Sequence, residues 1–268
     1  MVNPFLESDI ASFLALAEDE GWLCDRWEFQ FLLRNFPEGC FVRREAGVGI
    51  GYVTAAKYGS SGWIGNLLVH QEARRRGIGK GLMELSLSAL LASGVETVWL
   101  TASEQGVGIY RRLGFVAVDH IHRWTGKGKE ATAGGSTLPP LDFELVTRVD
   151  RGGWGARRDE LLQATCERGE LYGAAAGFLC CQPWEGGTQI GPWGCLDKSD
   201  AGDLLEQALQ EAGERVFLDV PAGNQAAAAL LREKGFTVKG SNVLMYLGAE
   251  PLYRPEKIFA LASMGSMG

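Results

Sequence analysis

Residues Gly62–Leu82 read GWIGNLLVHQEARRRGIGKGL: an apolar run, a basic glycine-rich turn and the start of a helix. The run Ile64–Val69 is rich in strand formers and is expected to be buried on both faces. From Leu82 onward, leucines recur at roughly helical spacing. This order places the free N–H groups and the positive dipole end of the helix beside the turn. The stretch therefore predicts an anion site.

The turn Arg74–Lys80 is called the phosphate cradle below. Its glycines allow the backbone to approach a ligand closely and to adopt conformations closed to other residues. Four cations add positive charge: Arg74, Arg75, Arg76 and Lys80. The turn lacks a Gly-Lys-Ser/Thr ending, which argues against a nucleotide P-loop, and it lacks G-x-G-x-x-G, which argues against a dinucleotide site. A basic surface turn before a helix is the structural alternative.

The cradle has the pattern Arg74-x-x-Gly77-x-Gly79 between a strand and an amphipathic helix. It resembles the acetyl-CoA pyrophosphate loop of the GNAT superfamily of N-acetyltransferases, whose pattern is Arg/Gln-x-x-Gly-x-Gly/Ala. The resemblance implies that the backbone amides of residues 75–80, including those of Ile78 and Lys80, hold the pyrophosphate.

The resemblance extends to both sides of the cradle. It implies that the strand before the cradle pairs with the pantetheine arm through the backbone of Leu67, Leu68 and Val69. Further on, the superfamily commonly has Asn-x-x-Ala-x-x-Leu-Tyr-x-x-x-Gly-Phe. Here Tyr110 and the Gly-Phe pair match this pattern. Ser103 stands where the superfamily has the asparagine, and the resemblance implies that Ser103 contacts CoA.

Composition narrows the class of protein. The 268 residues suffice for one large domain or two ordinary ones, and no apolar run reaches the length of a membrane span. No signal peptide is recognisable, and six cysteines without metal-ligand spacing indicate reduced thiols of a cytoplasmic protein. With three histidines, no metal is expected. A net charge of −7, with the cradle as the only marked basic cluster, argues against nucleic acid.

The second half of the chain repeats the first. Residues 126–140 lack apolar periodicity and predict a flexible linker. Beyond it, Leu230–Phe236 echoes Ile109–Phe115, both ending in Gly-Phe. The turn Asp197–Gly202 is shorter than the cradle and has no arginine, so this copy is predicted to keep the fold and to lack the phosphate site.

We therefore predict an α/β protein with a mixed sheet, made of two tandem GNAT-like domains. Residues 1–125 form the acetyl-CoA-binding catalytic domain, 126–140 the linker, and 141–268 a degenerate GNAT-like domain without a pyrophosphate loop. The second half also resembles the C-terminal domain of YitH-like tandem GNAT proteins, for example in Trp154–Arg158 and Ile190–Trp193.

The family resemblance implies an acetyl-CoA-dependent N-acetyltransferase that moves the acetyl group directly to a primary amine of a small molecule or peptide. The leaving thiolate benefits from an acid, which in the superfamily is often a tyrosine at the position of Tyr110; helix packing is the alternative role. Glu104, at a strand end, is the first candidate base, with a solvated loop carboxylate as its alternative. Trp22, between the first two helices, is a candidate acceptor contact or a packing residue.

A second class of function stays open: a non-catalytic acyl-CoA sensor or interaction module. Turnover with a panel of amines separates it from the enzyme. The expected partners are acetyl-CoA as co-substrate and a small-molecule or peptide amine, with no nucleic acid and no membrane. A homodimer is left open.

Overall fold

The computed structural model describes residues 1–129 and 142–268. Contacts divide the chain into two units: Met1–Leu100 together with Gly265–Gly268, and Thr101–Met264. Each unit contains strands of a mixed sheet flanked by helices, which confirms the predicted α/β class. In these described residues, no helix combines the length and apolar character needed to cross a bilayer.

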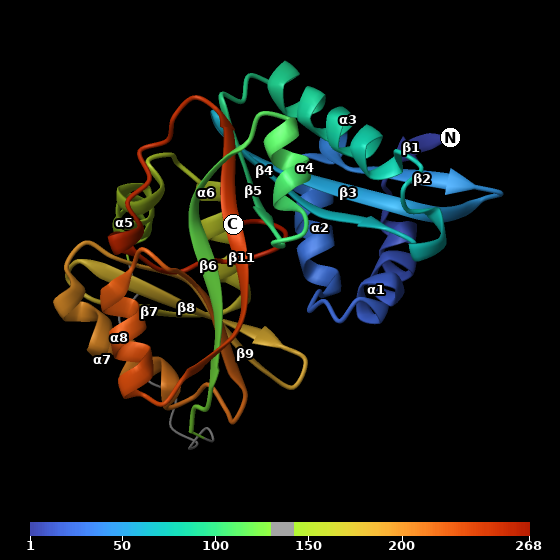
Figure 1. Ribbon diagram of the computed structural model, residues 1–268. Helices are drawn as coiled ribbons and strands as arrows, with labels where there is room; N and C mark the ends of the chain where they lie inside the picture. Colours follow the sequence, from blue (N-terminus) through green and yellow to red (C-terminus); the bar gives the residue numbers. More distant parts are fainter. Residues whose placement is uncertain (130–141) are drawn as a thin grey trace. The chain divides into compact units, whose positions relative to one another are not determined.

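The first unit carries its strands in the order β1-β2-β3-β4-β5. The strands are β1 (Val2–Pro4), β2 (Phe41–Glu45), β3 (Val48–Tyr58), β4 (Ser61–Val69) and β5 (Thr97–Ala102). The helices are α1 (Ile10–Asp19), α2 (Arg26–Asn35) and α3 (Ile78–Ala92). Neighbours from β1 to β4 are antiparallel, whereas β5 is parallel to β4. Helices α1 and α2 cover one face of these strands and α3 covers the other (Figure 1).

Aromatic side chains fix α1 and α2 to the sheet. The ring centroids of Phe13 in α1 and Phe29 in α2 lie 4.6 Å apart. Tyr52 of β3 meets Phe13 edge-on at 5.5 Å. Helix α2 begins at a capping box, in which the Asp25 carboxylate accepts a hydrogen bond from the backbone of Glu28. Burial of these rings anchors the loop between α1 and α2 at both ends.

Strand β4 changes its pairing half-way along. Its parallel register with β5 runs only from Ser61 to Trp63. Its register with β3 then shifts at a bulge beside Asn66, whose φ is 53°. The buried amide of Asn66 donates to the Thr54 hydroxyl at 3.0 Å, which satisfies both side chains at the irregularity. Beyond Trp63, β4 continues to Val69 with a backbone edge that β5 does not pair.

The second unit carries the strand order β11-β6-β10-β9-β8-β7, with β12 beside β9. The strands are β6 (Val116–Gly126), β7 (Glu170–Gly173), β8 (Gly177–Trp184), β9 (Gly187–Cys195), β10 (Val216–Pro221), β11 (Thr237–Gly248) and β12 (Ile258–Ala260). The helices are α4 (Val107–Arg112), α5 (Phe143–Trp154), α6 (Asp159–Arg168), α7 (Ala201–Leu209) and α8 (Gln225–Glu233). Strands β6 and β11, distant in sequence, lie side by side (Figure 1).

Alternation along β8 separates two cores in this unit. Phe178 packs with Val146, Val149 and Leu162 of α5 and α6. Its neighbour Leu179 belongs to a larger cluster with α7 and α8. Because successive strand side chains point to opposite faces, α5 and α6 cover one face and α7 and α8 the other.

The segment predicted to be a linker, 126–140, is described only at its beginning. Gly126 is the last residue of β6. The backbone N–H groups of Gly128 and Lys129 donate to the carbonyls of Gly213 and Leu209, at 2.8 and 2.7 Å. Residues 130–140 lie outside the described residues. Strand β6 pairs along both edges, with β10 on one side and β11 on the other.

Candidate functional site

The phosphate cradle joins β4 to α3. After a 3₁₀ turn (Gln71–Ala73), two residues adopt positive φ: Arg75 at 64° and Gly77 at 78°. Gly77 then stands at the N-cap of α3 and offers no side chain to the helix. The N–H groups at the start of α3 therefore have no side-chain cap, and the helix dipole makes their position favourable for an anion.

Space around the glycines supports a ligand at this helix end. Gly77 needs glycine because of its φ. Gly79 and Gly81 have ordinary helical conformations, so for them the expectation of unusual backbone angles is not met. A Cβ on Gly79 would meet only Val69, at 3.6 Å, and a Cβ on Gly81 would meet nothing within 4 Å. Packing within the protein does not require these two glycines, so the space beside them at the helix end is open.

The predicted cations of the cradle differ in what they contact. The Arg74 guanidinium donates to the Val69 carbonyl at 2.9 Å and to the Glu20 carboxylate at 2.5 Å. These bonds tie the end of β4 to the end of α1. Hydrogen bonds from Gln71 and from Arg74 lower the pKa of Glu20.

The other three cations are also exposed. Arg76 pairs with Glu45 at 2.5 Å, and Lys80 lies 3.7 Å from Glu84. Arg75 has no ion pair within the described ranges. Among the four cations, Arg75 is thus the one whose charge is uncompensated by the chain. Ile78, the first residue of α3, instead packs against β3 at Gly51, where an added Cβ would lie 2.8 Å from it.

The strand before the cradle offers a backbone edge. Leu68 is buried, and Leu67 and Val69 are half-buried. From Ile64 to Val69, β4 extends about 20 Å at 3.3 Å per residue. An extended arm with amide groups, such as pantetheine, can pair with such an edge as an added strand does. The structure thus brings the predicted arm residues and the cradle into one continuous surface of the first unit.

Trp22 lies in the loop that follows α1. Its side chain is 41% exposed, and its backbone N–H donates to the carbonyl of Ala17 at 2.9 Å. Leu23 beside it is 49% exposed. The loop therefore presents two large apolar side chains to solvent.

Tyr110 belongs to α4 in the second unit. Its ring meets Phe115 edge-on, with centroids 6.0 Å apart. Burial raises the pKa of Tyr110 to about 12. Its hydroxyl therefore stays protonated at neutral pH, which is the state required of a hydrogen-bond donor or acid.

Ser103 and Glu104 precede α4 and are exposed. The Ser103 carbonyl accepts a hydrogen bond from the backbone of Gly106 at 2.8 Å, which starts the helix. The Glu104 carboxylate lies 3.5 Å from Nε2 of His120, and its side chain is 71% exposed. His122 is half-buried further along β6. Within the second unit, the structure thus brings Glu104 and His120 together as an exposed pair.

In the second copy, side chains and a strand occupy the positions equivalent to the cradle and to the edge of β4. At the turn before α7, the Asp197 carboxylate accepts from the backbone of Ser199 at 2.9 Å, and that of Asp200 from Ala176 at 2.8 Å. Strand β9, the counterpart of β4, pairs with β10 only from Thr188 to Ile190. Beyond that point β12 pairs with β9 and occupies the edge. The sequence pattern predicted the changed turn but gave no sign of β12.

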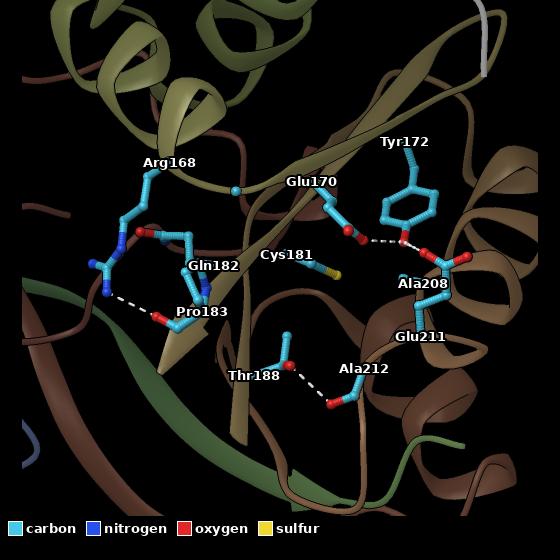
Figure 2. A pocket seen from close by; sticks show the side chains of 11 residues that line it. Arg168, Glu170, Tyr172, Cys181, Gln182, Pro183, Thr188, Ala208, Glu211 and Ala212 are labelled. Atoms are coloured by element: carbon cyan, nitrogen blue, oxygen red, sulfur yellow. Dashed lines mark hydrogen bonds between the residues drawn. The ribbon is translucent and has the colours of Figure 1, made fainter. Parts of the chain in front are cut away.

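The second unit also contains a cavity of 290 Å³ (Figure 2). Around it, Tyr172 donates to Glu170 at 3.0 Å and Thr188 to the Ala212 carbonyl at 2.8 Å. Arg168 donates to the Pro183 carbonyl at 2.7 Å. No residue predicted from the sequence lines this cavity. In the part of the chain that the structure describes, no three His, Cys, Asp or Glu side chains gather as metal ligands.

Comparison with known proteins assigns these features to a family. The acetyltransferase (GNAT) family model matches residues 5–115, which include β4, the cradle and the Gly-Phe pair. A second acetyltransferase (GNAT) domain model matches residues 146–260. The chain carries two GNAT domains in tandem. This confirms the resemblance found in the sequence.

Curated relatives of this tandem GNAT chain are N-alpha-acetyltransferases. One is N-alpha-acetyltransferase 30 from Dictyostelium discoideum, 27% identical over 53% of this chain and 80% of its own length. Another is N-alpha-acetyltransferase MAK3 from Arabidopsis thaliana, 28% identical over 38% of this chain. The chain spans 58% of the length of the latter.

Solved structures share the fold over the whole chain. A putative acetyltransferase from Pyrococcus horikoshii has a TM-score of 0.84 at 22% identity, covering 100% of this chain and 95% of that one. A GCN5-related N-acetyltransferase from Sphaerobacter thermophilus has a TM-score of 0.65 at 16% identity, covering 97% and 98%. At these identities the likeness concerns the fold alone.

Proposed function

We propose that the first GNAT domain transfers the acetyl group of acetyl-CoA to the α-amino group of a peptide or protein. The observation that carries the proposal is the uncapped start of α3, with open space at Gly79 and Gly81, next to the part of β4 that β5 does not pair. The N-alpha-acetyltransferase relatives favour a peptide amine over other acceptors.

The residues present fit acetyl-CoA. Backbone N–H groups at the start of α3 would bind the pyrophosphate, and each such helix-end interaction contributes roughly 0.3–1 kcal/mol. Arg75 would add an uncompensated charge beside it. The backbone edge of Leu67–Val69 would orient the pantetheine arm, which the half-buried side chains of Leu67 and Val69 shield from water. Bound acetyl-CoA supplies the thioester from which the acetyl group leaves.

We propose Tyr110 as the acid and Glu104, paired with His120, as the route for the amine's proton. Tyr110, protonated at neutral pH, would donate a hydrogen bond to the leaving sulfur. The exposed pair of Glu104 and His120 would pass the amine's proton to solvent. An α-amino group, with a pKa of about 7.7–8.0, is roughly 10% neutral at pH 7, against about 0.04% for a lysine side chain. Of these two amines, the α-amino group therefore depends less on a catalytic base to reach its neutral, nucleophilic form.

The test is thiol release from acetyl-CoA by the purified full chain. The acceptors are tetrapeptides with free α-amino groups, the same peptides with a blocked N-terminus and an internal lysine, and spermidine. We expect turnover with some of the free peptides and little with the other two sets. Turnover with spermidine or lysine alone would refute the α-amine assignment. Binding of CoA by calorimetry without turnover on any amine would instead favour the sensor function.

A further inference from the structure

The position of the reactive end of the donor follows from the length of β4. This step rests on the proposed function. An arm that begins at the cradle and runs back along the part of β4 that β5 does not pair passes Val69 first. Two amide units and a thioethyl end span about five extended residues, or roughly 16 Å. Counting five residues from Val69 reaches Gly65 and Asn66, at the bulge.

The residues found at this position come from the far end of the sequence. The carbonyl of Gly265 accepts a hydrogen bond from the Asn66 backbone at 3.4 Å. The same oxygen lies only 2.3 Å from where a Cβ on Gly65 would stand. At the other end, a Cβ on Gly268 would lie 2.5 Å from the ring of Trp63. The segment Gly265–Gly268 thus runs antiparallel to β4 in direct contact with it.

The face that this segment covers is the one opposite α3. A Cβ on Gly62 would point at Leu90 of α3, 2.9 Å away. Since strand side chains alternate, Trp63 and Gly65 point away from α3. Gly265–Gly268 therefore lies on the same side of β4 as α2, beside the expected thioester and not behind the pyrophosphate.

Two hydrogen bonds within the first unit hold the segment in place. The Ser266 hydroxyl donates to the buried carboxylate of Glu28 in α2 at 2.9 Å. The Tyr58 hydroxyl donates to the Met267 carbonyl at 3.0 Å. Ser266 and Met267 are only 2% and 1% exposed. A wall fixed in this way positions what it touches without rearrangement.

We propose that Gly265–Gly268 is the acceptor-side wall of the acetyl-transfer site and that Gly265 determines which acceptors fit. Gly265 differs from its neighbours because it is exposed, and a Cβ there would meet nothing within 4 Å. Its φ is not in the left-handed region, so the backbone does not demand glycine. The missing side chain leaves room beside the thioester for the first side chain of a peptide acceptor.

Proximity to the reactive end is tested by Gly265→Cys and oxidised CoA. The new thiolate attacks the disulfide of CoA, forms a mixed disulfide with one half and releases the other half as free CoA thiol. The control is Gly202→Cys in α7, where a Cβ also meets nothing within 4 Å. By mass spectrometry of the intact chain, we expect Gly265→Cys to couple at least about tenfold faster than the control. Acetyl-CoA should suppress this coupling.

Equal coupling rates, or coupling that acetyl-CoA does not suppress, would overturn the inference while leaving the proposed function intact. Failure of acetyl-CoA to bind at all in calorimetry would remove both. The second experiment is Gly265→Leu, with Gly202→Leu as its control. We expect kcat/KM for the tetrapeptides to fall about tenfold or more, most for large first residues, with an unchanged KM for acetyl-CoA. Wild-type peptide kinetics in Gly265→Leu would refute the assignment of Gly265.

Discussion

Replacing Gly79 by glutamate should move stability and ligand affinity in opposite directions. The new Cβ meets Val69 at 3.6 Å, an ordinary contact, so the fold accommodates it. A glutamate in place of glycine in the first turn of α3 gains about 0.5 kcal/mol of helix propensity. Its negative charge near the N-terminus of α3 adds roughly 0.3–1 kcal/mol to the stability of the folded protein. Unfolding of the free protein should therefore occur at an equal or slightly higher temperature.

The effect on CoA is larger and unfavourable. A carboxylate about 5 Å from a doubly charged pyrophosphate costs about 1.7 kcal/mol even at the dielectric constant of water, roughly 15-fold in affinity. Calorimetry with CoA and thermal unfolding of the free chain measure the two quantities. Gly79→Ala is the matched control, because it fills the same space without the charge and should retain CoA binding. Unchanged CoA affinity in Gly79→Glu would remove the cradle from the binding site.

Three further predictions concern catalysis, pH and stability. Tyr110→Phe should lower kcat about 10²-fold with little change in the KM for acetyl-CoA; a value within about twofold of wild type would assign Tyr110 to packing. Because burial raises the pKa of Tyr110 to about 12, the hydroxyl keeps its proton through the alkaline range. The pH profile of kcat/KM should therefore rise near the amine pKa of about 8 and show no tyrosine-dependent fall up to about pH 10; a fall there that Tyr110→Phe abolishes would contradict it. In α5, Asp150→Asn should destabilise the chain by about 3–5 kcal/mol, because Asp150 and Arg158 form a bidentate pair, at 2.6 and 3.0 Å, that is almost fully buried. Removing the exposed partner of Asp159 by Arg157→Ala should cost far less stability than Asp150→Asn, and equal losses in chemical denaturation would refute the burial argument.

The cradle was predictable because its signal is local. A strand, a turn with Gly77 and a helix are encoded within about twenty consecutive residues, and each element has its own pattern. The Gly-Phe pair was recognisable in both halves for the same reason, since a helix stop followed by a strand needs no distant partner. Local patterns of this kind predicted the fold class and the strand, turn and helix around the cradle.

The contacts of individual side chains were not predictable in this way. Arg74 lies in the pattern that favours phosphate binding, yet its guanidinium bonds to Glu20 and to the end of β4. Nothing near Arg74 in the sequence identifies a partner more than fifty residues earlier. The sequence of Gly265–Gly268 contains no pattern that predicts its position. That position depends on hydrogen bonds with Glu28 and Tyr58, more than two hundred residues away.

Strand β12 makes the second copy a case of intramolecular competition. A segment tethered to its own groove acts at an effective concentration of about millimolar or higher. A free ligand of micromolar affinity at micromolar concentration cannot displace it. Introducing arginine and glycines into the turn before α7 would therefore leave the second copy unable to bind CoA. The edge of β9 would still be occupied by β12, residues Ile258–Ala260. Binding of a ligand arm along β9 would first require β12 to leave, before any change in the turn could have an effect.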